Sequence, residues 1–201
     1  MSVILMNITR LAIFTAFWPI VMYLVNCLIA RKFKKIDVKL AVLYFMTVAL
    51  IGVFGEIFLD TAYNYIVGNP LWQYNIFPIH GGYTSAYAPI IWGTYGLHLY
   101  LLHDTLAKRW SIKNGWLLVL LFSFEALLIE SIVTISSRLY LGEYMYYYFP
   151  GDLWHVTSIQ NMPFYFICGM VILKTIKRFR TDPVFFSAMS AALIIVIVFF
   201  A

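Results

Sequence analysis

Acidic side chains inside apolar segments are the first feature of this sequence that points to chemistry. Glu56 and Asp60 lie four residues apart, so a helix places both on one face. Glu130 lies in a second apolar segment, five residues after Glu125. Burial disfavours ionisation of a carboxyl, so a protonated and an ionised carboxyl side by side form an acid–base pair. We expect Glu56 and Glu130 to converge in one pocket and to act as acid and base.

The same acids also have a structural interpretation. Protonated or hydrogen-bonded carboxyls hold apolar helices together, and Arg138 is near enough in sequence to pair with Glu130. Both interpretations stay open at this stage. Glu125 lies about 140° around the helix from Glu130, so the two cannot face one partner.

Two aromatic-rich stretches, 71–96 and 142–169, resemble each other. Tyr74 in the first corresponds to Tyr146 in the second, and each is followed after three residues by Phe-Pro. A Thr-Ser pair follows in each stretch, and a glycine comes 12 residues after the threonine in both. We expect these stretches to fold over the pocket as a lid, although an interfacial aromatic belt and helix N-caps would use the same residues.

The candidate site combines the acids with polar and aromatic residues of these two stretches. The candidate catalytic residues are Glu56, Glu130, Asp60, His80 and His155. The candidate substrate-binding residues are Trp72, Tyr74, Tyr146, Trp154, Thr84, Thr157, Gln160 and Asn161.

The histidines and cysteines do not indicate a metal or a cofactor. His98 and His103 are five residues apart, which does not fit the three- or four-residue spacing of helical metal ligands. A b-type haem needs two deep histidines, and only His98 is deep. Cys27 and Cys168 both lie in apolar runs, which favours packing over a disulfide. We expect no metal and no cofactor.

Composition places the chain in a membrane. Of its 201 residues, 63% are hydrophobic and 11% charged, against roughly 25% charged in soluble domains. We predict one all-α transmembrane domain, 1–201, that forms a polytopic bundle. The six expected spans are 9–30, 40–64, 86–107, 115–140, 158–175 and 183–201.

The basic residues predict the orientation. Twelve of the 14 Lys and Arg residues lie at 31–39, 108–113 and 174–180, which are alternate connections. Short basic loops stay in the cytoplasm, so both termini and both aromatic loops are expected on the other side of a cell membrane. The net charge of +5 therefore reflects topology and does not indicate nucleic-acid binding.

The alternation also predicts a parallel internal repeat. Units 40–109 and 115–178 would be two helical hairpins of equal orientation, related by an axis near the membrane normal. The flanking helices, 9–30 and 183–201, lie outside the repeat.

Six spans with membrane acids and many aromatics, including Asp60 followed by Trp72, resemble small integral-membrane terpenoid and carotenoid cyclases. The resemblance implies a carboxylic acid that protonates an alkene and aromatic faces that stabilise the cation. The Pro-x-Glu-Glu element of the lycopene-cyclase type is absent.

The leading hypothesis is a membrane enzyme that acts on a lipid-like or isoprenoid substrate in the outer half of the bilayer. Membrane lipids and this substrate are the expected partners, and an oligomer is left open. One alternative is a small-molecule or proton-coupled transporter, although the second and fourth spans lack a central Gly or Pro break. Another is a membrane subunit of a larger complex.

Overall fold

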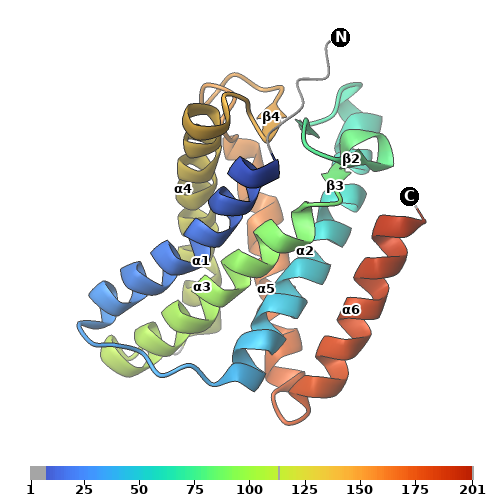
Figure 1. Ribbon diagram of the computed structural model, residues 1–201. Coiled ribbons are helices and arrows are strands. Elements are labelled where there is room, and N and C mark those ends of the chain that lie inside the picture. Colours follow the sequence, from blue (N-terminus) through green and yellow to red (C-terminus); the bar gives the residue numbers. More distant parts are fainter. Residues whose placement is uncertain (1–7, 113, 201) are drawn as a thin grey trace.

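The computed structural model describes residues 8–112 and 114–200, which fold into a helical bundle (Figure 1). The predicted all-α class is confirmed. Lys113, part of one predicted basic connection, lies outside the described residues. The helices are α1 (Ile8–Ala30), α2 (Val38–Val67), α3 (Ala88–Arg109), α4 (Gly115–Leu141), α5 (Met162–Phe179) and α6 (Pro183–Phe199).

Four segments of the described chain are long and apolar enough to cross a membrane. They are α1, α2, α4 and the segment Ile159–Phe179, which contains α5. Helix α6 is apolar but has only 17 residues. Helix α3 has 22 residues and is more polar, and it packs between α1 and α2. Four of the six expected spans therefore have the length and hydropathy that crossing a membrane requires, and the count of six stays a prediction.

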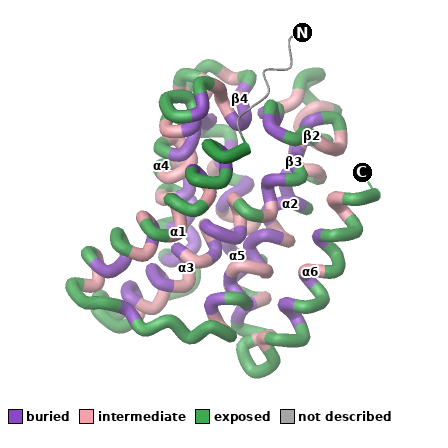
Figure 2. The backbone as a smooth tube through the Cα atoms, in the orientation of Figure 1, coloured by how far each residue is buried: buried purple, intermediate pink, exposed green. Residues whose placement is uncertain are grey.

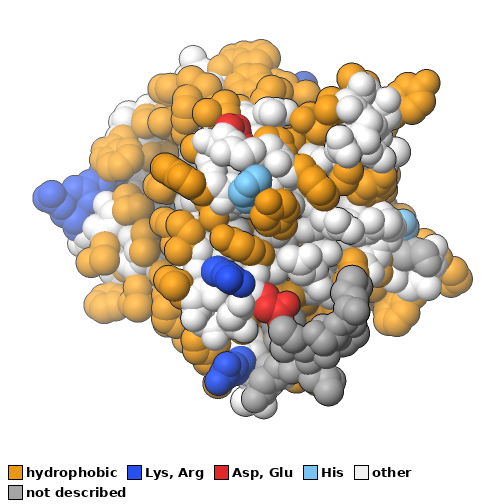
Figure 3. Space-filling model, turned by 90° about the horizontal axis from the view of Figure 1, so that it is seen from above, with side chains coloured by type: hydrophobic (Ala, Val, Ile, Leu, Met, Phe, Trp, Pro, Cys, Tyr) orange, Lys and Arg blue, Asp and Glu red, His pale blue; other side chains and the backbone are white. Residues whose placement is uncertain are grey.

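The aromatic stretches form short strands at one end of the bundle. Strand β1 (Trp72–Tyr74) pairs antiparallel with β4 (Tyr146–Tyr148), and β2 (Pro78–Ile79) pairs with β3 (Thr84–Ser85). The α1–α2 and α5–α6 connections and the C-terminal end of α3 lie at the opposite end (Figure 1). Seen from the strand end, hydrophobic side chains outnumber charged ones over the described surface (Figure 3).

Local sequence signals define where the two long central helices begin and end. The Asp37 side chain accepts a hydrogen bond from Leu40 N (3.2 Å) at the start of α2. Asn114 caps α4 in the same way. Both helices end at a glycine in the left-handed conformation, Gly68 with φ 86° and Gly142 with φ 85°. Glycine adopts this conformation without steric cost, so the chain turns sharply into each aromatic stretch.

Close packing of α2 against α3 forms the centre of the bundle, where buried residues face inward (Figure 2). Gly96 of α3 makes this approach feasible, because a Cβ atom there would lie 2.6 Å from the Tyr44 carbonyl oxygen. A Cβ at Gly93 would run into the Phe45 ring, and one at Gly52 into the Trp92 ring. Small residues at helix contacts allow this approach in membrane bundles.

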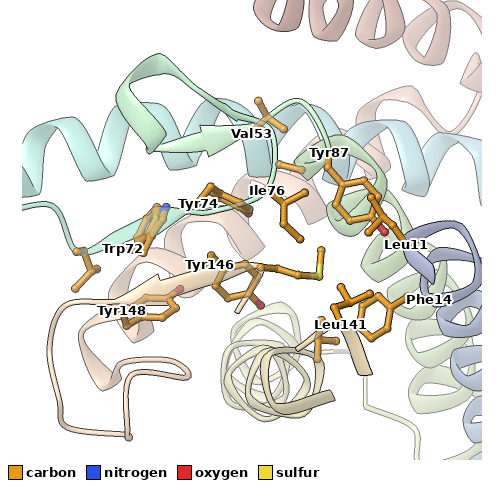
Figure 4. Close-up of a cluster of buried hydrophobic side chains, with 14 residues drawn as sticks. Leu11, Phe14, Val53, Trp72, Tyr74, Ile76, Tyr87, Leu141, Tyr146 and Tyr148 are labelled. Carbon is orange, nitrogen blue, oxygen red and sulfur yellow. The ribbon is translucent and has the colours of Figure 1, made fainter. Parts of the chain in front are cut away.

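A second packing centre lies at the strand end. The rings of Trp72, Tyr74, Tyr146 and Tyr148 pack between the strands and the helices together with Phe14 of α1 (Figure 4). Tyr74 and Tyr146 are 5.3 Å apart between ring centroids. This aromatic layer fixes the strands over the ends of α2 and α4.

The Gly96 contact gives a stability prediction. Gly96→Ala places a methyl group against backbone that cannot move aside, so it should destabilise the protein by about 1–3 kcal/mol. Thermal unfolding in detergent would show a lower Tm. Gly115→Ala is the matched control, because a Cβ there meets nothing within 4 Å. Equal melting of the two variants would contradict this account of the α2–α3 contact.

Candidate functional site

Two carboxyls from different helices line one cavity of about 80 Å³ near the strand end. Glu56 belongs to α2 and is buried, and Glu130 belongs to α4 and is partly buried. Tyr74 and Tyr146 from the strands also line the cavity. The structure therefore brings together both acids and two of the aromatic residues that the sequence singled out.

Glu56 accepts three hydrogen bonds from neutral donors. The Tyr74 hydroxyl donates to Oε1 at 2.5 Å, and the Trp92 indole N–H donates to the same oxygen at 2.8 Å. The Thr84 hydroxyl donates to Oε2 at 2.5 Å. One donor comes from β1, one from β3 and one from α3, so the carboxyl is fixed by three separate elements.

Glu130 has a corresponding set of partners. The Tyr148 hydroxyl donates to Oε1 at 2.6 Å, and the Tyr165 hydroxyl donates to Oε2 at 2.7 Å. Thr157 also donates to Oε2, and the Asn161 amide donates to the Tyr148 oxygen. Asn161 thus acts on Glu130 through Tyr148.

The two sets match in sequence spacing as well as in contacts. The tyrosine follows its glutamate after 18 residues in both cases, and the threonine follows after 28 and 27 residues. The third donor, Trp92 or Tyr165, comes eight residues after the threonine in both. In the β1–β4 pair, Trp72 faces Tyr148 and Tyr74 faces Tyr146, so a half turn about the pair exchanges Tyr74 with Tyr148.

This correspondence differs from the one expected from sequence. The sequence comparison made Tyr74 the equivalent of Tyr146 in the second stretch. The contacts to the glutamates instead make Tyr148 the equivalent of Tyr74. Tyr146 lines the cavity instead.

Within the described residues, no Lys or Arg forms an ion pair with Glu56 or Glu130. Arg138, the partner considered for Glu130, donates to Gly142 O (2.8 Å) and lies over the Tyr144 ring. Neutral donors therefore orient both carboxyls in place of a cationic partner.

The tyrosines in the strands act as donors because they keep their protons. Burial raises the pKa of the Tyr74 phenol well above its usual value, and the nearby Glu56 raises it further. Burial, with Glu130 nearby, does the same for the pKa of Tyr148. At neutral pH both phenols therefore stay protonated and donate hydrogen bonds to the carboxyls.

Apolar and aromatic side chains form the rest of the cavity wall. Helix α1 contributes Phe14, Trp18 and Met22, and α4 contributes Ile129 and Val133. A hydrogen bond between the Thr15 and Tyr87 hydroxyls (2.5 Å) joins α1 to the start of α3. The cavity is thus an apolar chamber with two acidic groups, closed on one side by the first helix.

The other three predicted catalytic residues all lie away from the cavity wall. Asp60 is fully buried and accepts from Leu71 N at 2.5 Å, which fixes the start of the first aromatic stretch. His80 Nε2 is 3.0 Å from Ile197 O of α6. His155 Nδ1 is 2.7 Å from Tyr148 O, behind the strand that contacts Glu130.

The remaining substrate-binding candidates occupy varied positions. Trp72 is buried, and its N–H donates to Tyr83 O at 2.8 Å. The Gln160 side chain accepts from the Tyr63 hydroxyl at 2.6 Å on the exposed side. Trp154 is 82% exposed. These three do not line the cavity.

The sequence reading missed Trp92, Tyr148 and Tyr165, which complete the contacts to the two acids. The equal glutamate-to-tyrosine spacing could have identified Tyr148. In the described part of the chain, no three His, Cys, Asp or Glu side chains gather as metal ligands.

Comparison of the chain with models of protein families, with curated proteins and with solved structures finds no match. The function must therefore be inferred from the cavity itself.

The role of the Tyr148 hydroxyl can be tested directly. Tyr148→Phe removes the donor to Glu130 and the acceptor for Asn161, so it should lower stability by about 1–3 kcal/mol. Tyr147→Phe is the control, because Tyr147 makes ring contacts with Tyr144, Phe149 and His155 that phenylalanine preserves. Thermal unfolding of both variants in detergent is the measurement, and an equal Tm would argue against the contact.

Proposed function

We propose that this chain is an integral membrane enzyme that acts on a lipid-like or isoprenoid substrate by carboxyl acid–base chemistry. The observation that carries the proposal is the apolar cavity lined by both Glu56 and Glu130. Two acids held by neutral donors in one apolar chamber suit proton transfer to and from carbon.

The reaction needs no oxidant or reductant. The carboxylic acid of one glutamate gives its proton to a carbon of a C=C bond, whose π electrons form the new C–H bond and leave a carbocation. The carboxylate of the other glutamate removes a proton from a carbon next to the cation. The electron pair of that C–H bond forms the π bond of the new double bond. The substrate is isomerised or cyclised, and the proton ends on the second glutamate.

The cavity wall supports a substrate without a charged head group. Its described lining contains no Lys, Arg or His that could pair directly with a phosphate group. Protonation of an alkene needs no such partner and uses the two carboxyls that the lining contains.

The aromatic rings support a cationic intermediate. Trp92, Tyr95, Tyr146 and Tyr165 line the same cavity as the two acids. A cation over an aromatic face is stabilised by about 2 kcal/mol or more when water is excluded. The rings would stabilise the carbocation between the two proton transfers.

Access from the bilayer is supported by the position of α1. This helix contributes to the cavity wall but buries few of its own residues. A lipid-soluble substrate would enter beside it from the membrane.

The acid–base proposal predicts the fate of a solvent proton. Protein in lipid vesicles would be incubated in D₂O with linear polyenes, squalene and lycopene, and products analysed by mass spectrometry. Isomers or cyclic products should carry one deuterium per turnover. Glu56→Gln and Glu130→Gln should each lower the rate by about 10²–10⁴-fold. Glu143→Gln, outside the cavity lining, is the control. Unchanged rates in both cavity variants would remove the acid–base assignment.

The proposal extends to an internal repeat and to the orientation. The matching contacts of Glu56 and Glu130 support two hairpins, about 40–109 and 115–178, related by an axis along the bundle. The basic connections support a cytoplasmic location for the end opposite the strands, with both termini and the cavity toward the other side.

The orientation can be tested by labelling single cysteines in whole cells. Asn69→Cys lies in the exposed turn after α2, and Thr181→Cys lies in the exposed α5–α6 connection. A membrane-impermeant maleimide should label position 69 in intact cells and position 181 only after permeabilisation. Cys27 and Cys168, buried and partly buried, are replaced by Ala in the background. The reverse labelling pattern would invert the proposed orientation.

A proton-coupled transporter is the second candidate, favoured by the matching of the two halves, since parallel repeats occur in carriers. Solute-dependent acidification inside vesicles, lost in Glu56→Gln and Glu130→Gln, would favour it over the enzyme.

A further inference from the structure

A second buried polar cluster lies one helical turn from the cavity and is not part of its wall. His98 Nε2 of α3 is 2.6 Å from Glu125 Oε1 of α4. His98 Nδ1 is 2.7 Å from the Asn26 amide nitrogen of α1. Because that amide donates its hydrogen, the neutral ring carries its own hydrogen on Nε2, facing Glu125. Three helices thus meet at one histidine–carboxylate pair.

The cluster reaches the cavity through Tyr95. Its hydroxyl donates to Glu125 Oε2 at 2.8 Å, and its side chain lines the cavity. Trp92, Tyr95 and His98 follow one another at intervals of three residues on α3, and therefore lie along one face. Trp92 itself donates to Glu56. A polar stripe on α3 thus runs from the carboxyl cavity to His98.

A separate set of polar contacts lies further along α3, closer to the basic end of the bundle. Lys34 Nζ donates to Leu101 O at 2.6 Å and to the Thr105 hydroxyl at 2.7 Å, and pairs with Asp104 at 2.9 Å. Leu101 lies three residues after His98 on the same helix. Lys34 precedes α2, at the end opposite the strands.

Burying a polar cluster at this position costs free energy of folding, so the cluster calls for an explanation. His98 is 2% exposed and Asn26 fully buried, and the Asn26 Oδ1 atom has no partner. Buried polar atoms are normally satisfied, often by a water molecule, and ionisable groups inside spans commonly mark proton pathways. The unpaired Oδ1 therefore offers a place for a hydrogen-bond donor such as water beside His98.

We propose that His98, Glu125 and Tyr95 form a proton path between the carboxyl cavity and the basic end of the protein. His98 takes a proton at Nδ1, in place of the Asn26 hydrogen bond, and gives its Nε2 proton to Glu125 Oε1. The carboxyl then turns and gives this proton to the Tyr95 oxygen, as the Tyr95 hydroxyl turns away from Glu125 and releases its own proton into the cavity. Each group gains one proton and loses one, and the imidazole, the carboxyl and the hydroxyl turn back to restore the starting hydrogen bonds.

The charged and titratable groups around His98 are few. Helix α4 supplies Glu125 and α3 supplies Tyr95, while α1 supplies the neutral Asn26. On α2, Tyr44 contacts His103, further along α3. Within the described residues, Glu125 is the only carboxyl within ion-pair distance of His98.

The path rests on the proposed function in that it supplies the protons that Glu56 and Glu130 use. In the reaction above the proton ends on a different glutamate from the one that gave it. A connection to bulk water restores the starting arrangement. The path also gives the cavity a proton source at the end that we assign to the cytoplasm.

The test uses no substrate, so its failure is separate from failure of the enzyme proposal. Trp92 touches Glu56, and a change in the protonation of that carboxyl alters the fluorescence of the adjacent indole. Purified protein in nanodiscs would be mixed rapidly from pH 8 to pH 5 while emission is recorded. The part of the signal missing in Trp92→Phe reports on Glu56.

Tyr95→Phe, His98→Gln and Glu125→Gln should each slow the Trp92 signal by about tenfold or more. Tyr95→Phe removes only a hydroxyl, so it keeps the packing if the other two variants fold poorly. Glu143→Gln, outside both clusters, should leave the rate unchanged. Wild-type rates in Tyr95→Phe and Glu125→Gln would overturn the path, as would the absence of any pH-dependent Trp92 signal.

Discussion

The placement of two carboxyls in the interior, without an ion pair to any Lys or Arg of the described residues, is the constraint on which the rest of this structure depends. An uncompensated buried charge costs several kcal/mol, so each acid requires a full set of hydrogen-bond donors. Glu56 and Glu130 obtain them from strands, connections and the following helix. The aromatic stretches between the helices are therefore ordered, because they complete the surroundings of the acids.

The need to position these donors also explains why the aromatic stretches form paired strands. A tyrosine that reaches a glutamate must be held by its backbone, and the β1–β4 pair does this for Tyr74 and Tyr148. Gly68 and Gly142 turn the chain from each long helix into its strand. The glycine turns, the strand pairing and the contacts to the acids thus all favour the same fold, as expected for a sequence that specifies one structure.

Sequence alone could predict the helices, the two acids in one pocket and the polar residues Thr84 and Thr157 next to them. It could not fix the register of three consecutive tyrosines, 146–148, because alternate side chains of a strand face opposite sides and only the contact to Glu130 decides. It also could not pair His98 with Glu125, because that contact depends on the rotation of α3 against α4. Trp154 could not be placed either, since aromatic residues occur in cores and at membrane surfaces alike.

The pairing of β1 with β4 has a mechanical consequence. Asn75 N donates to Met145 O (2.9 Å) and Phe149 N to Leu71 O (3.0 Å), so the backbone ladder extends beyond the paired strands. Separating the two aromatic stretches at this end would break the whole ladder at once, whereas moving α1 outward strains mainly side-chain contacts. We therefore expect the softest degree of freedom of the described residues to be a sideways movement of the first helix, with the paired strands as a stiff frame.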